Sequence, residues 1–135
     1  MSKLRQKSEF NIVAAEHLIK EALYAPSVHC SYYSCFQLLK FTIKDFFGID
    51  YETQSSNIAS KKQNTHQYVV NYISDGLKEF VPFEERRNFK RSIKDLKQFR
   101  IESDYENIEV GSDKSNEALR KAKEIRTYMI KSFNL

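Results

Sequence analysis

Glycine and proline are scarce in this chain, with three glycines and two prolines among its 135 residues. An average protein carries about 12% of these two residue types together, and folds of many short strands need them in their tight turns. The scarcity excludes a many-stranded sandwich or barrel and predicts an all-helical protein. Because the length is typical of one domain and 41% of the residues are hydrophobic, we predict a single helical domain over residues 1–135.

Apolar residues recur at three- and four-residue steps in five stretches separated by polar joints. This spacing is typical of amphipathic helices. Because short joints favour antiparallel neighbours, we predict an antiparallel, up-and-down four-helix bundle with one additional shorter helix. The predicted helices cover residues 3–23, 27–47, 65–80, 83–105 and 113–133, of which the third is the shortest.

The stretch 27–47 carries two apolar stripes, so more than half of its surface is apolar or aromatic. A helix with so little polar surface belongs at the centre of a bundle. We therefore predict that this helix is the central one and that Phe36 and Leu39 are fully buried.

The ends of that helix follow from its flanking residues. Pro26 should end the preceding helix, since proline cannot continue the hydrogen-bond ladder, and Ser27 should cap the helix that follows. Gly48 should end the central helix. The polar stretch 49–64 shows little periodicity, so we predict a long mobile loop there.

The motifs of common cofactor and metal enzymes are missing, including the phosphate-binding loop, the dinucleotide fingerprint, HExxH and CxxC. His17, His29 and His66 fall on three different predicted helices, and their spacing indicates no metal site. We therefore expect neither a metal nor a cofactor. His17 is expected to be a solvated surface residue.

The sequence contains no apolar run of signal-peptide or membrane-spanning length. Cys30 and Cys35 lie five residues apart in one predicted helix, where their Cα atoms are too distant for a disulfide. We expect two reduced thiols, a cytoplasmic location and no membrane partner.

The predicted helix 83–105 is strongly basic, with seven basic residues between Arg86 and Arg100 and one acidic residue, Asp95. One interpretation is a basic stripe that binds the phosphates of RNA or of a nucleotide. The other is an ordinary solvated helix face. Exposed aromatic residues are not interleaved with the charges, which favours the solvated face.

Arg100 differs from the other basic residues because a helical projection places it inside the apolar arc of its helix. A buried arginine needs a partner or a ligand. Asp104, one turn further on, is the nearest candidate partner. Arg100 is therefore either half of a buried structural pair or an anion-binding or catalytic arginine in a seam between helices.

Three motifs on successive predicted helices carry a family resemblance. They are Tyr32-Tyr33 with Phe36, then Thr65-His66, then Arg100-Ile-Glu-Ser-Asp-Tyr105. In this order and spacing, and over about residues 9–133, the chain resembles the small stand-alone HEPN-domain proteins of bacteria and archaea. Ser103 stands where that family often has alanine.

The resemblance implies a bundle of four or five helices that dimerises and that is often encoded beside a minimal nucleotidyltransferase in toxin–antitoxin pairs. Nuclease members of the family cleave RNA without metal through an Arg-x(4 to 6)-His motif. Arg100 matches the arginine, but Tyr105 fills the histidine position, and a phenol with a pKa near 10 is a poor general base at neutral pH. The candidate catalytic residues are Arg100, Tyr105 and His66.

We therefore predict a nucleotide- or RNA-associated binding protein, with a second copy of the chain and a nucleotidyltransferase as candidate partners. One alternative is a metal-independent ribonuclease toxin that uses Arg100 with Tyr105 or His66. Another is a purely structural interaction module. The predicted ligand-binding residues are Arg100, Asp104, Tyr105, Lys97 and Tyr33.

Overall fold

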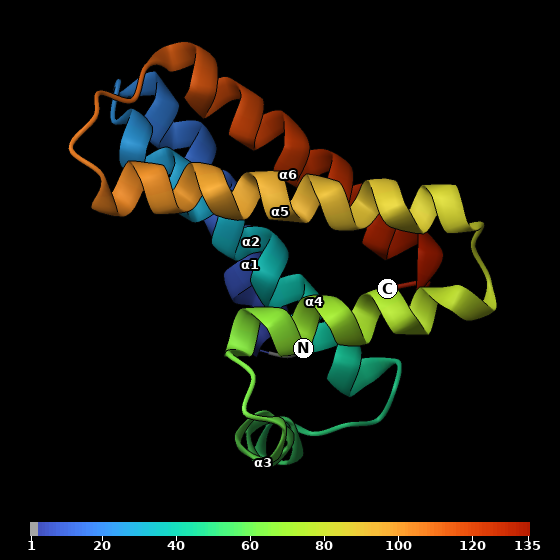
Figure 1. The fold of residues 1–135 in the computed structure, drawn as a ribbon. Helices are drawn as coiled ribbons and strands as arrows, with labels where there is room; N and C mark the ends of the chain where they lie inside the picture. The colour runs from blue at the N-terminus through green and yellow to red at the C-terminus, as the bar shows by residue number, and fades with distance from the viewer. Residues whose placement is uncertain (1–2) are drawn as a thin grey trace.

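A computed structural model describes residues 3–135, and its regular elements are all helical (Figure 1). The predicted all-helical fold is therefore confirmed. None of the helices in this part of the chain is long and apolar enough to cross a membrane. The elements are α1 (Lys3–Lys20), α2 (Tyr24–Asp45), α3 (Tyr51–Lys61), α4 (Thr65–Gly76), a short 3₁₀ turn (Leu77–Glu79), α5 (Phe83–Tyr105) and α6 (Ser112–Ser132).

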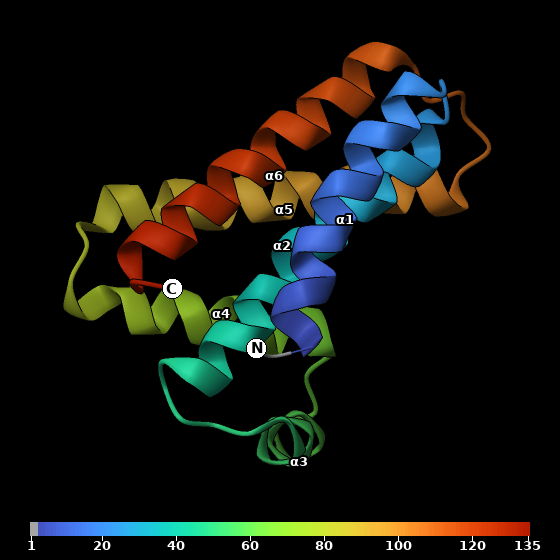
Figure 2. The same cartoon turned by 180° about the vertical axis from the view of Figure 1, so that it is seen from behind.

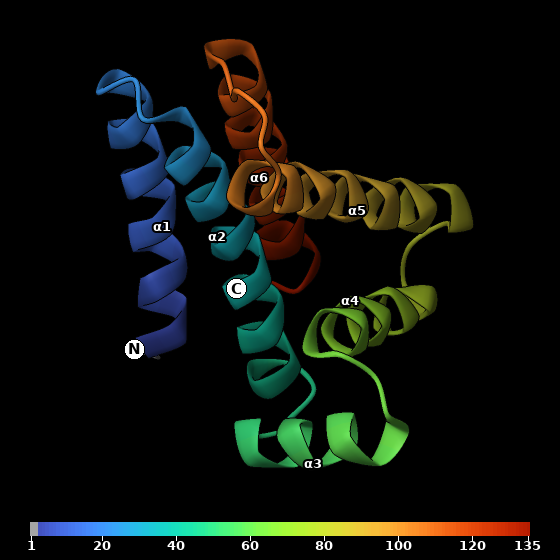
Figure 3. The same cartoon turned by 60° about the vertical axis from the view of Figure 1, so that its left-hand side comes forward.

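The helices are arranged around α2, which packs against α1, α4, α5 and α6. Figure 3 shows α1 and α2 side by side in opposite directions, with α5 crossing α2 steeply. In the view from behind, α1 and α6 both lie on the face nearer the viewer, in front of α2 and α5 (Figure 2). The two helices contact one another. Figure 1 shows α4 running below α5 in the opposite direction, so that α2, α4 and α5 meet on one side of the bundle.

The central position of α2 is visible in the burial of its side chains. Val28, Leu38, Leu39 and Ile43 have no exposed surface, and Phe36 is 9% exposed. Four neighbouring helices pack against α2, and at its C-terminal end a large side chain, Phe46, is 49% exposed. The prediction that this helix forms the centre of the core is confirmed.

Small serine side chains allow α1 and α2 to approach closely. Ser8 Oγ donates a hydrogen bond to the Ser34 carbonyl, and Ser34 Oγ donates one to the Ser8 carbonyl, at 2.6 and 2.7 Å. Ser27 Oγ donates to the Ala15 carbonyl at 2.8 Å. Each hydroxyl is buried, and each is satisfied by the backbone of the other helix, so the polar groups join the two helices.

The boundary between α1 and α2 differs from the prediction. α1 ends at Lys20, and Ala22 adopts a left-handed conformation with a φ of 59°. α2 begins at Tyr24, which places Pro26 in its first turn, where the missing N–H is not needed. The predictions that Pro26 ends the first helix and that Ser27 caps the second were wrong, because the Ser27 hydroxyl bonds to α1 instead.

The predicted loop at 49–64 contains the helix α3, so that prediction was wrong. Asp50 caps the helix by accepting a hydrogen bond from the Thr53 N–H at 2.7 Å, and Lys62 ends it in a left-handed conformation. Only Gln54 of this helix is buried. A helix that buries one side chain leaves no apolar periodicity in the sequence, which is why the pattern did not reveal it.

Aromatic rings close the C-terminal end of α2. Phe46 and Phe47 pack against Phe133, with ring centroids 4.9 and 5.7 Å away. Gly76 gives the Phe47 ring its space, because a Cβ at this position would lie 2.3 Å from the ring carbon Cζ. The absence of a side chain at Gly76 therefore lets α4 approach the end of α2.

Candidate functional site

Arg100 lies on α5 close to α2, and its side chain is 8% exposed. Its guanidinium carbon lies 5.2 Å from the ring centroid of Tyr32 and 5.5 Å from that of Tyr33. These are cation–π distances, and the contacts offset part of the cost of burying the charge. The prediction that Arg100 falls inside the apolar arc of its helix is confirmed by this burial.

Asp104 is the charged partner of Arg100, as the spacing on the helix predicted. One carboxylate oxygen, Oδ2, lies 3.6 Å from Arg100 Nη1 and also accepts a hydrogen bond from His29 Nδ1 at 2.8 Å. Arg100 Nε is buried and has no hydrogen-bond partner among the described residues. Asp104 thus links an arginine of α5 to a histidine of α2.

His66, at the start of α4, contacts the same aromatic group of α2. Its Nδ1 lies 2.5 Å from the Tyr32 hydroxyl, and its ring centroid lies 4.6 Å from that of Phe36. Burial, helped by the positive charges of Lys97 and Arg100, lowers the pKa of His66 to about 4. His66 is therefore neutral at neutral pH, and its other ring nitrogen, Nε2, has no hydrogen-bond partner among the described residues.

Burial also raises the pKa of the Tyr32 phenol above its usual value, and the effect outweighs the opposing charge of Arg100. The hydroxyl therefore stays protonated and remains a hydrogen-bond donor. One continuous aromatic cluster joins α2 to α4 in the folded protein. Its members are Tyr32, Tyr33 and Phe36 of α2 and His66 of α4.

A cleft lies beside this cluster, where α4 and α5 approach each other near α2. Its cavity has a volume of about 160 Å³. The side chains around it are aromatic, aliphatic, amide and cationic, and none of them is a carboxylate. They are Tyr32, His66, Gln67, Val70, Asn71, Lys90, Ile93, Lys94 and Lys97.

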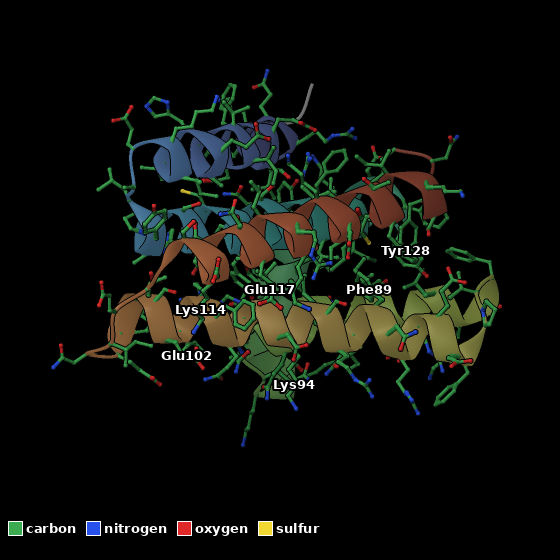
Figure 4. All side chains as sticks on the ribbon, turned by 90° about the horizontal axis from the view of Figure 1, so that it is seen from above. Phe89, Lys94, Glu102, Lys114, Glu117 and Tyr128 are labelled. Carbon is green, nitrogen blue, oxygen red and sulfur yellow. The ribbon has the colours of Figure 1, made fainter. Side chains whose placement is uncertain are left out.

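Three lysines of α5 give the cleft its charge. Lys90, Lys94 and Lys97 follow one another at four- and three-residue steps, so they share a face of the helix. None of them forms an ion pair with a described residue, whereas Lys114 and Lys121 of α6 pair with Glu102 and Asp95 of α5. Figure 4 shows Lys94 on the side of α5 that faces away from α6.

The structure brings the predicted site residues together in two adjoining groups. Asp104, Tyr33 and Tyr105 surround Arg100, and Lys97 lies with His66 along the cleft. The Tyr105 ring centroid is 5.8 Å from the Arg100 guanidinium carbon, but the residue is 74% exposed. His17 is exposed, as expected.

Sequence reasoning missed several residues of these groups. His29 lies one turn before Tyr33 on α2, and their ring centroids are 4.7 Å apart; this helical spacing could have revealed it. Lys90 and Lys94 were interpreted as part of a solvated face. Gln67 and Asn71 lie one turn apart on α4, and apart from this spacing nothing in the sequence indicates that their amides line a cleft.

The described residues contain no group of three His, Cys, Asp or Glu side chains that could hold a metal ion. Cys30 and Cys35 are both free. Burial raises the thiol pKa of each cysteine above its usual value, so neither has the thiolate character of a reactive cysteine.

Comparison with known proteins gave one family match. A search of curated proteins found no match. The family profile described as the HEPN domain matches residues 1–132, which is almost the whole chain. It covers all three motifs that carried the resemblance, together with the Arg100 cluster and the α4–α5 cleft. The chain therefore belongs to the HEPN domain family.

Proposed function

We propose that this HEPN protein binds nucleotides or RNA, with the α4–α5 cleft as its anion-binding site. One observation carries the proposal: Lys90, Lys94 and Lys97 line a cleft that contains no carboxylate. Three lysines on one face repel one another, and the described carboxylates do not neutralise them. A bound polyanion would relieve this repulsion and release its counterions.

The basic surface continues along α5 outside the cleft. Arg87 and Arg91 line an adjoining depression together with Lys90, Lys94 and Asp95. An extended strip of positive charge fits successive phosphates better than it fits a small inorganic anion. This extent supports RNA as the ligand, with a mononucleotide as the smallest unit that would bind.

The test measures RNA binding as a function of salt. We expect the logarithm of the affinity to fall linearly with the logarithm of the salt concentration, and Lys94→Gln to lower both the affinity and the slope, by about one phosphate contact. Lys131→Gln on α6 is the matched control, because it removes the same charge from an exposed residue without an ion pair. Equal losses in the two variants would refute a site in the cleft.

Arg100 is proposed to anchor the site and to offer its outer edge to an anion. If the structural pair dominates, Arg100→Met and Asp104→Asn should each destabilise the fold by about 1–3 kcal/mol. The first removes the guanidinium from its contacts with Tyr32 and Tyr33, and the second leaves that buried charge without its carboxylate partner. The double variant should recover part of that loss. Weaker RNA binding by Arg100→Met without loss of stability would instead assign Arg100 wholly to the ligand.

A metal-independent ribonuclease is the second candidate function, and the His29–Asp104–Arg100 arrangement favours it. Asp104 holds His29 Nδ1, which leaves Nε2 for proton transfer, and Arg100 lies beside the same carboxylate. His29 would supply the imidazole that Tyr105 does not. RNA cleavage in the presence of a metal chelator, lost in both His29→Gln and Arg100→Met, would establish this function; we expect little or no cleavage.

A homodimer is the proposed assembly. Phe10 and Val13, three residues apart on α1, are 67% and 63% exposed, and such apolar surface supports a contact with a second copy. Light scattering should give twice the 16.0 kDa of the chain; a particle of monomer mass at micromolar concentrations would refute the dimer. We further propose a cytoplasmic protein whose partner is a nucleotidyltransferase, which co-purification with the product of a neighbouring gene would test.

A further inference from the structure

The size of the α4–α5 cavity restricts what part of a ligand can enter it. A volume of about 160 Å³ holds several water molecules at about 30 Å³ each, but it lies below the roughly 300–1,000 Å³ of pockets that enclose whole ligands. The cavity therefore suits one planar ring system.

The walls of the cavity are suited to a flat heterocycle. Val70 of α4 is partly exposed and supplies apolar surface on which such a ring can stack. Tyr32 and Ile93 also line the cleft, but their side chains are almost fully buried, at 1% and 2% exposed. The side-chain amides of Gln67 and Asn71, one turn apart on α4, offer both donors and acceptors. A nucleobase has the matching features, namely flat faces and an edge of donors and acceptors.

His66 adds a further polar group to the same wall. Its Nδ1 is held by the Tyr32 hydroxyl, while Nε2 has no hydrogen-bond partner among the described residues. With the hydroxyl as donor to Nδ1, the neutral imidazole carries its proton on Nε2 and can donate a hydrogen bond to a ligand. Because burial and the nearby cations keep His66 neutral, it adds no further positive charge to the site.

The charged and apolar parts of the cleft together narrow the ligand class. A purely apolar ligand would leave Lys90, Lys94 and Lys97 without counter-charges, and a bare phosphate would leave the apolar wall uncovered. A nucleotide satisfies both parts. In a duplex the faces and edges of each base are already occupied by stacking and pairing, so the base must be unpaired.

We infer that the α4–α5 cleft binds one unpaired nucleotide, with the base inserted beside Val70 and Ile93 and the phosphate held by the lysines. This inference rests on the proposed function and adds to it the form of the ligand. The nucleotide comes either from single-stranded RNA or from a free mononucleotide pool, since both present the same base and phosphate.

The experiment compares three probes with the full chain: adenosine 5′-monophosphate, a short single-stranded oligoadenylate RNA, and the same strand annealed to its complement. Val70→Phe fills the cavity without changing charge, and Asn71→Ala removes an edge contact while leaving the cavity open. Lys131→Gln serves as the control for charge. Circular dichroism and thermal unfolding establish that each variant is folded before binding is measured.

We expect the wild-type protein to bind the single strand roughly tenfold or more tightly than the duplex, the factor expected from one stacked base. Val70→Phe should remove that preference and leave duplex binding unchanged, and Asn71→Ala should reduce it. If the wild-type protein binds the mononucleotide and Val70→Phe abolishes this binding, the free nucleotide is a ligand of the cleft. Binding of the single strand without the mononucleotide identifies RNA.

Two further outcomes separate the inference from the proposed function. Salt-dependent binding of single strand and duplex with equal affinity, unaffected by Val70→Phe, would overturn the base pocket while the RNA-binding function stands. Failure of all three probes to bind the wild-type protein would overturn both. If Val70→Phe fails to fold, Asn71→Ala decides, because an unchanged preference in that variant also contradicts insertion of the base.

Discussion

The free energy of unfolding should fall as the pH is lowered from about 7 towards about 4, and His66 should account for a measurable part of this fall. In the folded protein the ring faces Tyr32, Phe36, Lys97 and Arg100, and its pKa is about 4. In the unfolded chain an ordinary histidine has a pKa near 6.5. The unfolded state therefore takes up the proton first as the pH falls, which destabilises the fold, whereas above about pH 7 the ring is neutral in both states and contributes nothing.

The size of the effect follows from these two pKa values. Between about pH 7 and about pH 5.5 the unfolded chain becomes mostly protonated at His66 and the folded protein does not, which gives a loss of about 1 kcal/mol by the linkage relation. Part of the ring is exposed, so solvent screening lowers the expected loss to about 0.5–1 kcal/mol. This window lies above the range in which most carboxylates titrate.

Urea denaturation at the two pH values measures the effect. We compare the wild-type protein with His66→Gln, in which the pH-dependent loss should be smaller by the predicted amount. His17→Gln, which replaces an exposed histidine on α1, is the control substitution. Titration of the His66 ring by NMR gives the folded pKa directly. A ring that titrates near pH 6.5, or an identical pH dependence in His66→Gln and the wild type, would refute the reasoning.

Three further predictions concern stability. Leu39→Ala should cost about 2–5 kcal/mol, because a fully buried side chain of α2 leaves a cavity; a loss below about 1 kcal/mol in urea denaturation would mean that α2 is not central. Asp50→Ala should cost about 1 kcal/mol through loss of the cap and should speed amide hydrogen exchange in α3, and unchanged exchange there would contradict the capping role. Gly76→Ala should cost about 1–3 kcal/mol, since the new Cβ must displace the Phe47 ring, and an unchanged melting temperature would show that the ring moves freely.

The long helices could be predicted from the sequence because their apolar periodicity records which face they bury. Leu39 on α2 and Ile93 on α5 follow this pattern, and both are buried. The same projection placed Arg100 among the apolar residues of α5 and paired it with Asp104, as the structure has it. Periodicity succeeds here because burial is a property of one helix at a time.

The elements that escaped prediction depend on other interactions. α3 buries only Gln54, so it has no apolar stripe. Hydrogen bonds hold it instead: the Asp50 cap, the bond from Gln54 Nε2 to the Ile49 carbonyl, and the bond from Asn57 Nδ2 to the Tyr68 hydroxyl. The start of α2 was misplaced because Ser27 was expected to cap its own helix, whereas its hydroxyl bonds to the carbonyl of Ala15. A serine can serve either purpose, and only the packing of α1 against α2 decides which.

The candidate site was predictable only in part, since it is formed by three helices at once. The sequence identified Arg100, His66 and Lys97 separately, but the cleft exists because α4 and α5 approach each other beside α2. His29 joins the site through Asp104, which lies 75 positions further along the chain. No spacing within one helix predicts such a contact.

The arrangement around Arg100 also bears on which charges are free to bind a ligand. Two tyrosine rings and Asp104 already enclose its guanidinium, and Asp104 is itself held by His29. An anion that reached Arg100 would have to compete with a carboxylate fixed from both sides. The cleft lysines face no such competitor among the described residues, so ligand affinity should depend on them more than on Arg100. The arginine at the motif position then serves first to fasten α5 to α2, which keeps the lysines of α5 in place opposite α4.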